Sequence, residues 1–134
     1  MRHPRRGEVW LADIGIAGKL RPVIVIGRDD PDPPRALTTY VTVTTKDRDS
    51  RYEVDLSELR CLDNPTQSVA NAHGVTTIPT VRFVRQIGSA PTDLLNKIER
   101  AVLFALGIFA SVSIFSTCAR YASRIAAIFG DASR

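Results

Sequence analysis

The sequence predicts a mainly β fold, a small antiparallel barrel or curled sheet that is closed by a C-terminal helix. Two observations support this prediction. Short β-branched and aromatic segments, separated by glycines, prolines and charged turns, come first along the chain. Apolar residues at helical spacing begin only after them. At 134 residues the chain is long enough to bury a core as one domain.

Residues 21–26 are predicted as a buried strand because they are apolar and β-branched after Arg21 and Pro22. Residues 37–45 and 51–56 are predicted as strands because their side chains alternate between two faces. Four strands are expected, at residues 8–13, 21–26, 37–45 and 51–56. The loop before the third strand contains Pro31, Pro33 and Pro34, which exclude regular structure because they fix φ and remove donors. Two edge strands are expected at residues 68–71 and 75–78, on either side of a turn at His73 and Gly74.

The helix is predicted from Ser89 as its N-cap, from apolar residues at a spacing of three and four, and from Gly107 as its C-cap. Residues 101–118 carry no charge, which reaches the lower limit for a membrane-spanning helix. Gly107 and several hydroxyl residues weaken that reading, and we do not expect a span. We expect a domain at residues 1–108 and an apolar extension at 109–134, with a second, poorer helix at 121–129.

Composition and charge permit a nucleic-acid partner without requiring one. The net charge is +4 and the pI is about 9.5, which many unrelated proteins share. Cys61 and Cys118 have no metal-type spacing, so a reduced intracellular protein is expected. The first residues are followed by no apolar segment of the kind found in secretory signals, so the expected location is the cytoplasm.

The common catalytic motifs are absent from the sequence. It has no glycine-rich phosphate loop, no nucleophile elbow and no pair of histidines at metal spacing. We therefore predict no metal and no cofactor. His73 beside Gly74 is interpreted as a turn residue. The chemistry that remains is cationic and hydroxylic.

Arg21 stands at the start of an apolar strand, where burial of its guanidinium would cost heavily without a negative partner. It therefore pairs with a carboxylate, lies exposed or binds an anionic ligand. Thr44 and Thr45 close the next predicted strand, and strand ends of a small barrel converge on one rim, so these groups could face a common anion. Candidate residues for binding that anion are Lys19, Thr45, Lys46, Arg48 and Arg51.

Four blocks of this sequence resemble, in the same order, the MazF/PemK/Kid family of toxins. They are Arg-Gly-Glu-Val-Trp-Leu-Ala-Asp at residues 6–13, Gly-Lys-Leu-Arg-Pro-Val-Ile-Val-Ile at 18–26, the strand and turn at 40–54, and the segment 74–107. The resemblance covers about residues 5–108, and four blocks in the right order make a chance match improbable. The loop at residues 14–20 is shorter than in many members of the family.

The resemblance implies an SH3-like β-barrel, usually a homodimer, that serves as the toxin of a type II toxin–antitoxin system. It implies a metal-independent endoribonuclease of the mRNA interferase type, which cleaves single-stranded RNA at short sequences by attack of the 2′-OH. The implied partner is an antitoxin with an acidic disordered segment. The family's catalytic arginine and threonine match Arg21 and Thr44, and no second group is an obvious general base.

Two points stay open at this stage. Thr45 follows Thr44, so the register is ambiguous by one residue, although alternation places Thr45 with Val43 on the expected core face. The same fold could also serve a non-catalytic RNA- or protein-binding barrel, or a poison of another enzyme such as gyrase. The presence of both Arg21 and Thr44 favours catalysis.

Overall fold

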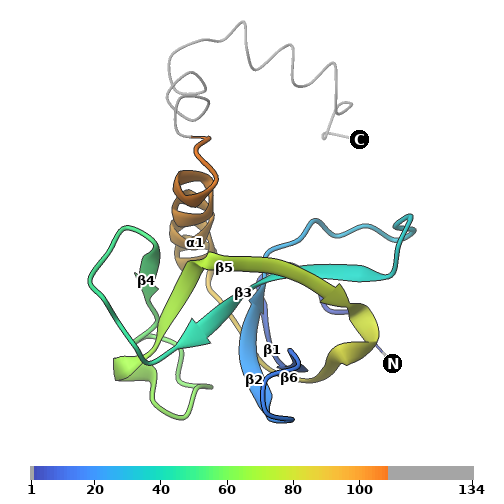
Figure 1. Ribbon diagram of the computed structural model, residues 1–134, viewed down its shortest axis with the longest axis horizontal. Coiled ribbons are helices and arrows are strands. Elements are labelled where there is room, and N and C mark those ends of the chain that lie inside the picture. The colour runs from blue at the N-terminus through green and yellow to red at the C-terminus, as the bar shows by residue number, and fades with distance from the viewer. Residues whose placement is uncertain (1, 109–134) are drawn as a thin grey trace, which may run out of the picture.

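The computed structural model describes residues 2–108, which form one six-stranded antiparallel sheet and one α-helix (Figure 1). The strands are β1 (Glu8–Asp13), β2 (Leu20–Val25), β3 (Leu37–Thr44), β4 (Glu53–Asp55), β5 (Val69–Pro79) and β6 (Phe83–Ser89). Two 3₁₀ turns, η1 (Pro65–Gln67) and η2 (Thr80–Arg82), flank β5, and α1 (Thr92–Ala105) follows the sheet.

The predicted fold class is confirmed. The sheet order is β4-β5-β3-β2-β1-β6 and every neighbouring pair is antiparallel. Within residues 2–108, β4 and β6 form the two edges and do not pair with each other, so the sheet is curled rather than closed by hydrogen bonds. No helix in this part of the chain is long and apolar enough to cross a membrane.

The predicted turn at His73 and Gly74 is wrong, because residues 69–79 form the single strand β5. The pairing with β3 is nevertheless irregular there. Tyr40 pairs with Thr76 and Thr42 with Asn71, so the one residue between them on β3 faces residues 72–75 on β5. Such a bulge bends a strand, and Figure 1 shows β5 bending near its middle.

The ends of α1 differ in how well they were predicted. Ser89 is the last residue of β6, a strand that was not predicted, and α1 begins at Thr92 with no side-chain cap, so the expected N-cap is wrong. The C-cap residue is Leu106 rather than the predicted Gly107, which follows it with a φ of 73° that favours glycine. The Gly107 N–H donates to the Phe104 carbonyl at 3.1 Å, and the Ile108 N–H donates to the Leu103 carbonyl at 2.9 Å. The expected extension at 109–134 and its helix at 121–129 lie outside the described residues.

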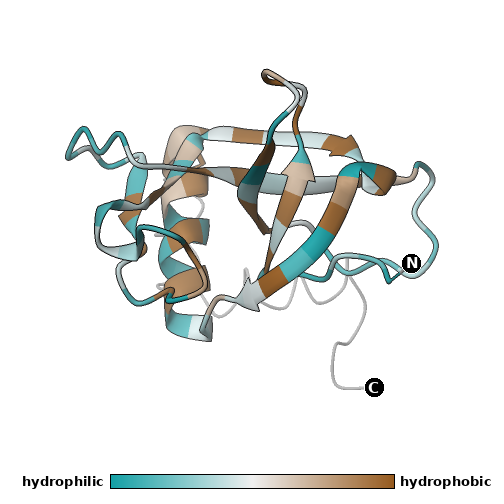
Figure 2. Cartoon of the chain, turned by 90° about the horizontal axis from the view of Figure 1, so that it is seen from below, coloured by the Kyte–Doolittle hydropathy of each residue, from teal (hydrophilic) through white to brown (hydrophobic). Residues whose placement is uncertain are grey.

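Both faces of the central strands are buried, because the sheet curls around one apolar cluster and α1 covers another (Figure 2). Ile24 packs with Leu94 and Ile98 of α1, whereas its neighbour Val23 faces the other cluster. In that second cluster, Phe83 of β6 meets the rings of Trp10 and Tyr40 edge-on, with centroids 6.2 and 5.9 Å apart. Alternation along each strand therefore supplies two cores rather than one core and one wet face.

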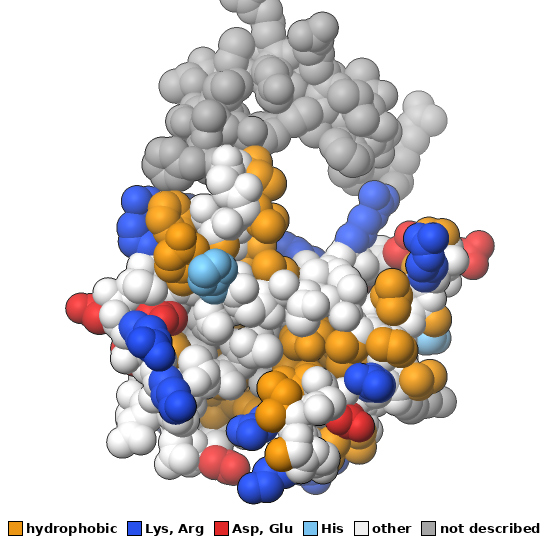
Figure 3. Space-filling model, viewed as in Figure 1, with side chains coloured by type: hydrophobic (Ala, Val, Ile, Leu, Met, Phe, Trp, Pro, Cys, Tyr) orange, Lys and Arg blue, Asp and Glu red, His pale blue; other side chains and the backbone are white. Residues whose placement is uncertain are grey.

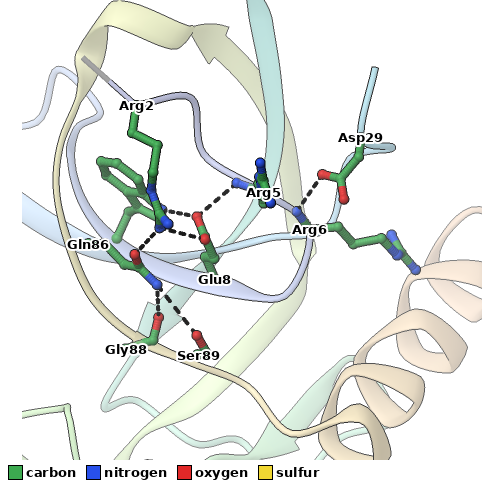
Figure 4. Close-up of polar contacts among 9 residues, drawn as sticks. Arg2, Arg5, Arg6, Glu8, Asp29, Gln86, Gly88 and Ser89 are labelled. Atoms are coloured by element: carbon green, nitrogen blue, oxygen red, sulfur yellow. Dashed lines mark hydrogen bonds and ion pairs between the residues drawn. The ribbon is translucent and has the colours of Figure 1, made fainter. Parts of the chain in front are cut away.

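A buried carboxylate ties the N-terminal segment to the sheet (Figure 4). Glu8 is only 9% exposed. It accepts hydrogen bonds from the Arg2 guanidinium at 2.6 Å, the Arg5 backbone N–H at 2.8 Å and the Trp10 indole N–H at 2.9 Å. Arg2 also donates to the side-chain oxygen of Gln86 on β6. This burial is tolerated because several donors meet the carboxylate.

Arg6 links the same segment to the helix. Its backbone N–H donates to Asp29 at 2.8 Å (Figure 4). Its guanidinium donates to the Ile26 carbonyl and forms an ion pair with Glu99 of α1. These contacts hold the N-terminal segment beside the C-terminal end of β2. The other end of β2, where Arg21 lies, is not involved in them.

Candidate functional site

Arg21 and Thr44 are brought opposite each other by the pairing of β2 with β3. Val23 pairs with Thr42, and the same antiparallel register continued by two residues places Arg21 opposite Thr44. Residues directly opposite in an antiparallel pair share a face of the sheet. The register therefore puts the guanidinium and the hydroxyl on the same face at the same end of the two strands.

A cleft of about 450 Å³ lies at these strand ends. Its lining includes four of the predicted site residues, namely Arg21, Thr44, Lys46 and Arg48. Ile14 and Ile16 of the β1–β2 loop add apolar surface, and β3, β4 and β5 contribute Thr42, Val43, Glu53 and Asn71. In Figure 3, basic side chains are spread around the β1–β2 loop and the segment after β3. The cleft thus has three cations against one carboxylate.

Arg21 is exposed, and its side chain makes no hydrogen bond or ion pair with any residue of the described range 2–108. A carboxylate partner, the first of the three possibilities that the sequence left open, is therefore excluded within that range. The guanidinium keeps its donors for another molecule, and its planar fork suits the oxygens of a phosphate.

The Thr44 hydroxyl is half-buried and accepts a hydrogen bond from the Lys46 backbone N–H at 3.2 Å. This contact shapes the chain as it leaves β3. A hydroxyl that accepts one bond can still donate its own proton. Thr44 therefore combines a fixed position with a donor that is open to the cleft.

Glu53, at the start of β4, holds the loop that carries the cleft's other cations. Its Oε2 accepts hydrogen bonds from the Ser50 N–H at 3.0 Å, the Ser50 hydroxyl at 2.9 Å and the Arg48 N–H at 3.3 Å. The Ser50 N–H is the main reason that the pKa of Glu53 lies below its usual value. A carboxylate with a lowered pKa is a weak base. Glu53 is therefore better described as a loop anchor than as a proton acceptor.

Three predicted binding residues do not line the cleft. Lys19 and Thr45 are exposed, and Thr45 lies beyond the end of β3, so its expected place on the core face is wrong. The Arg51 guanidinium lies over the ring of Phe104, with its central carbon 4.1 Å from the ring centroid. Their roles stay predictions.

Sequence reasoning missed the residues that β4 and β5 contribute to the cleft. Asn71 pairs with Thr42 on one side and Glu53 on the other, so three strands bring polar side chains together. Asn71 was placed at the end of a short edge strand, and its partners could not be derived because the bulge in β5 sets them. The only available signal was its position next to a glycine-containing irregular segment.

The described residues contain no metal-binding cluster, and the second hollow in the surface carries mixed charge. Within the described part of the chain, no group of three or more His, Cys, Asp or Glu side chains could hold a metal ion. A hollow of about 540 Å³ lies at the opposite ends of β2 and β3, beside the N-terminal segment. Its charged lining residues include both Arg28 and the aspartates Asp29 and Asp30, and it contains none of the predicted site residues.

A family model matches nearly all of the described chain. The model describes the PemK-like, MazF-like toxins of type II toxin–antitoxin systems, and it matches residues 5–106. A probable endoribonuclease MazF from Mycolicibacterium smegmatis is 32% identical over 112 residues, which cover 78% of this chain and 97% of that protein.

Solved structures show the same fold. An endoribonuclease in complex with its cognate antitoxin, from a mycobacterial species, matches with a TM-score of 0.67 and 25% identity, over 78% of this chain and 95% of that one. The Mycobacterium tuberculosis toxin MazF-mt6 matches with a TM-score of 0.64 and 26% identity, over 75% of this chain and 96% of that one.

Proposed function

This chain belongs to the family of PemK-like, MazF-like toxins of type II toxin–antitoxin systems, and we propose that it is a metal-independent endoribonuclease that cuts single-stranded RNA. The observation that carries the proposal is the exposed Arg21, without a partner among the described residues, opposite Thr44 in a cationic cleft. The name of the Mycolicibacterium smegmatis relative supports it.

RNA supplies its own nucleophile, so the protein needs to position and stabilise rather than to attack. In the proposed reaction, the 2′-OH attacks the adjacent phosphorus and loses its proton, and the bond from phosphorus to the 5′-oxygen breaks. The leaving oxygen takes up a proton, and the products carry a 2′,3′-cyclic phosphate and a 5′-OH. Because both electron pairs come from the substrate's oxygens, no redox step or cofactor is needed.

Arg21 and Thr44 have separate roles in this proposal. Arg21 donates to the non-bridging oxygens, where negative charge builds up in the transition state, and one such preorganised donor is worth about 100- to 1000-fold in rate. Thr44 donates its hydroxyl proton to the same phosphate. Catalysis is then mainly electrostatic, which agrees with a cleft that has one carboxylate, itself bound to the loop.

The remaining cations would bind the rest of the RNA strand. Lys46 and Arg48 line the cleft and would contact phosphates next to the one that is cleaved. We propose Lys19, Thr45 and Arg51 as outer contacts, reached only by a longer strand. This arrangement predicts a sequence preference set inside the cleft and an affinity set partly outside it.

The proposed partner is an antitoxin with an acidic, disordered segment. This segment folds as it binds in the cationic cleft, and its carboxylates displace RNA because they carry negative charge as the phosphates do. The solved endoribonuclease that is bound to its cognate antitoxin supports this partner class. We also propose that the chain forms a homodimer, because members of this toxin family usually do. The competing reading, a binding barrel without catalysis, would keep the partner but not the cleavage.

Primer extension on RNA from cells that express the chain tests the proposal. We expect reverse transcriptase to stop at one recurring short sequence in many transcripts, and the stops to vanish in cells that express Arg21→Ala. Matched expression of the two proteins, checked by immunoblot, is the control. Complementary DNA with no new stops at equal protein level would overturn the nuclease assignment.

A further inference from the structure

Gly74 of β5 lies against the side chains of Thr42 and Asn71, and these two side chains, the Asn71–Thr42 pair, line the cleft. A Cβ atom at Gly74 would lie 2.6 Å from the Thr42 hydroxyl oxygen and 3.2 Å from the Asn71 side-chain nitrogen. The first distance is too short for any side chain, so only glycine fits without a shift of the neighbours. The bulge in β5 thus brings a glycine against the paired residues Thr42 and Asn71.

The Asn71–Thr42 pair has free hydrogen-bonding groups. The Asn71 Oδ1 accepts the His73 backbone N–H at 3.1 Å, which fixes the orientation of the amide. Within residues 2–108, the Asn71 side-chain nitrogen and the Thr42 hydroxyl have no hydrogen-bond partner. Oδ1 also retains a second lone pair. The pair therefore presents donors and an acceptor on the cleft wall.

The Asn71–Thr42 pair belongs to the same cleft as the proposed catalytic pair. Asn71 and Thr42 line it together with Arg21 and Thr44. Thr42 and Thr44 share one face of β3, and two residues along a strand span about 7 Å. A nucleotide whose phosphate meets Arg21 could therefore extend its base toward Asn71.

We propose that Asn71, supported by Thr42, reads the Watson–Crick edge of one base beside the cleaved phosphate and sets the base preference there. This inference rests on the proposed function. An amide that donates from nitrogen and accepts at oxygen matches a base edge on which a donor lies next to an acceptor. Each base carries such a pair in its own place, so the fixed position of the amide in the cleft selects the base that fits. Single-stranded RNA is recognised in this way, by hydrogen bonds to exposed base edges.

Aspartate at the same position would keep the acceptor oxygen and replace the amide donor with a second acceptor. Its carboxylate only accepts, so it suits the adjacent N–H groups of guanine and repels the ring acceptor of adenine or cytosine. Asn71→Asp is therefore expected to move the preference at one position toward guanine, with slower cleavage overall because it adds negative charge to the cleft.

The test is cleavage of a random single-stranded RNA pool, with sequencing of the new ends. Wild type and Thr77→Val, an exposed β5 threonine outside the cleft, should share one base preference at a position beside the cut. Asn71→Ala and Thr42→Val should weaken it, by about tenfold for Asn71→Ala. Asn71→Ala that cuts more slowly with every preference unchanged would overturn the proposal, because it would show a structural role alone.

Binding separates this inference from the proposed nuclease. Arg21→Ala, alone and combined with Asn71→Ala, is titrated with short RNAs that differ at one base. A base preference that disappears in the double variant supports base reading by Asn71 even if wild type cuts nothing, a result that would overturn only the nuclease. Equal affinity of Arg21→Ala for all four bases would overturn Asn71 as a reader of base identity.

Discussion

The Oε2 atom of Glu53 accepts hydrogen bonds from both the backbone N–H and the hydroxyl of Ser50, at 3.0 and 2.9 Å. The Arg48 N–H donates to the same oxygen. One carboxylate at the start of β4 therefore holds the loop that places cations beside the cleft. The catalytic proposal depends on that loop as well as on the sheet.

Glu53→Ala is expected to weaken RNA binding more than the chemical step, because it frees a loop that contacts substrate before and during the reaction alike. We expect KM to rise on the order of tenfold and kcat to change less. Steady-state cleavage of a short RNA measures both. The control is Glu58→Ala, an exposed carboxylate outside the cleft. A fall in kcat at unchanged KM would instead indicate that Glu53 acts in the chemistry.

The lowered pKa of Glu53 gives this anchor a defined pH dependence. Its folded-state pKa lies below the unfolded value, so the charged form supports the fold at neutral pH. The contribution is present above the usual glutamate range and is lost as the pH falls through the lowered pKa. Proteolysis of the loop should therefore increase in acid for wild type and be high at all pH values for Glu53→Ala.

Thr44→Val is expected to reduce cleavage more than Thr45→Val. Thr44 is half-buried on the cleft wall, whereas Thr45 is exposed beyond the end of β3. Both substitutions remove a hydroxyl and keep the branched shape, so each serves as the other's control. Single-turnover cleavage gives the comparison. Equal rates for the two variants would show that the Thr44 hydroxyl does not contact the phosphate.

The charge-mimicry proposal predicts that RNA and antitoxin share Lys46 and Arg48. Lys46→Glu with Arg48→Glu should weaken the binding of both RNA and antitoxin. Added salt should also lower the affinity of the wild-type protein for each of them. Titrations at two salt concentrations measure this. Lys97→Glu with Arg100→Glu, exposed on α1 and outside the cleft, is the control with an equal charge change. If the cleft variant loses RNA but binds antitoxin normally, the two sites are distinct.

Glu8→Ala is expected to destabilise the fold without changing the cleft. It removes the acceptor for the buried Trp10 indole and for Arg5, and hydrogen bonds to a charged group contribute about 1.5–3 kcal/mol. Urea unfolding should show a loss of about that size, while cleavage below the transition stays normal. Unchanged stability would mean that water replaces the carboxylate at no cost.

The local sequence patterns were sufficient wherever neighbouring residues decide the structure. The strand at residues 8–13 was predicted with its observed bounds, and Gly107 follows the C-cap residue of α1. Arg21 and Thr44 were predicted to face a common anion because each lies near the end of a predicted strand, and both line the cleft.

The incorrect predictions concern segments whose structure is set by strand pairing with residues that are distant in the sequence. The sequence around His73 and Gly74 looks like a turn, but the residues before and after it, 69–71 and 76–79, both pair with β3 and keep it in β5 as a bulge. Ser89 resembles an N-cap, yet pairing of Glu8 with Ser89 extends β6 to that point. For the same reason the contribution of Asn71 to the cleft could not be predicted, since it depends on the register across three strands.

The central claim is that Arg21 stabilises the transition state of RNA cleavage, and single-turnover cleavage in EDTA tests it most directly. Wild type is expected to cut, to leave a 2′,3′-cyclic phosphate (or the 3′-phosphate formed when it opens) and a 5′-OH, and to be insensitive to added Mg²⁺. Arg21→Ala should be slower by about 100- to 1000-fold at saturating protein, and Arg21→Lys should recover little of the rate. Cleavage by Arg21→Ala at the wild-type rate, or activity that EDTA abolishes and Mg²⁺ restores, would contradict the account.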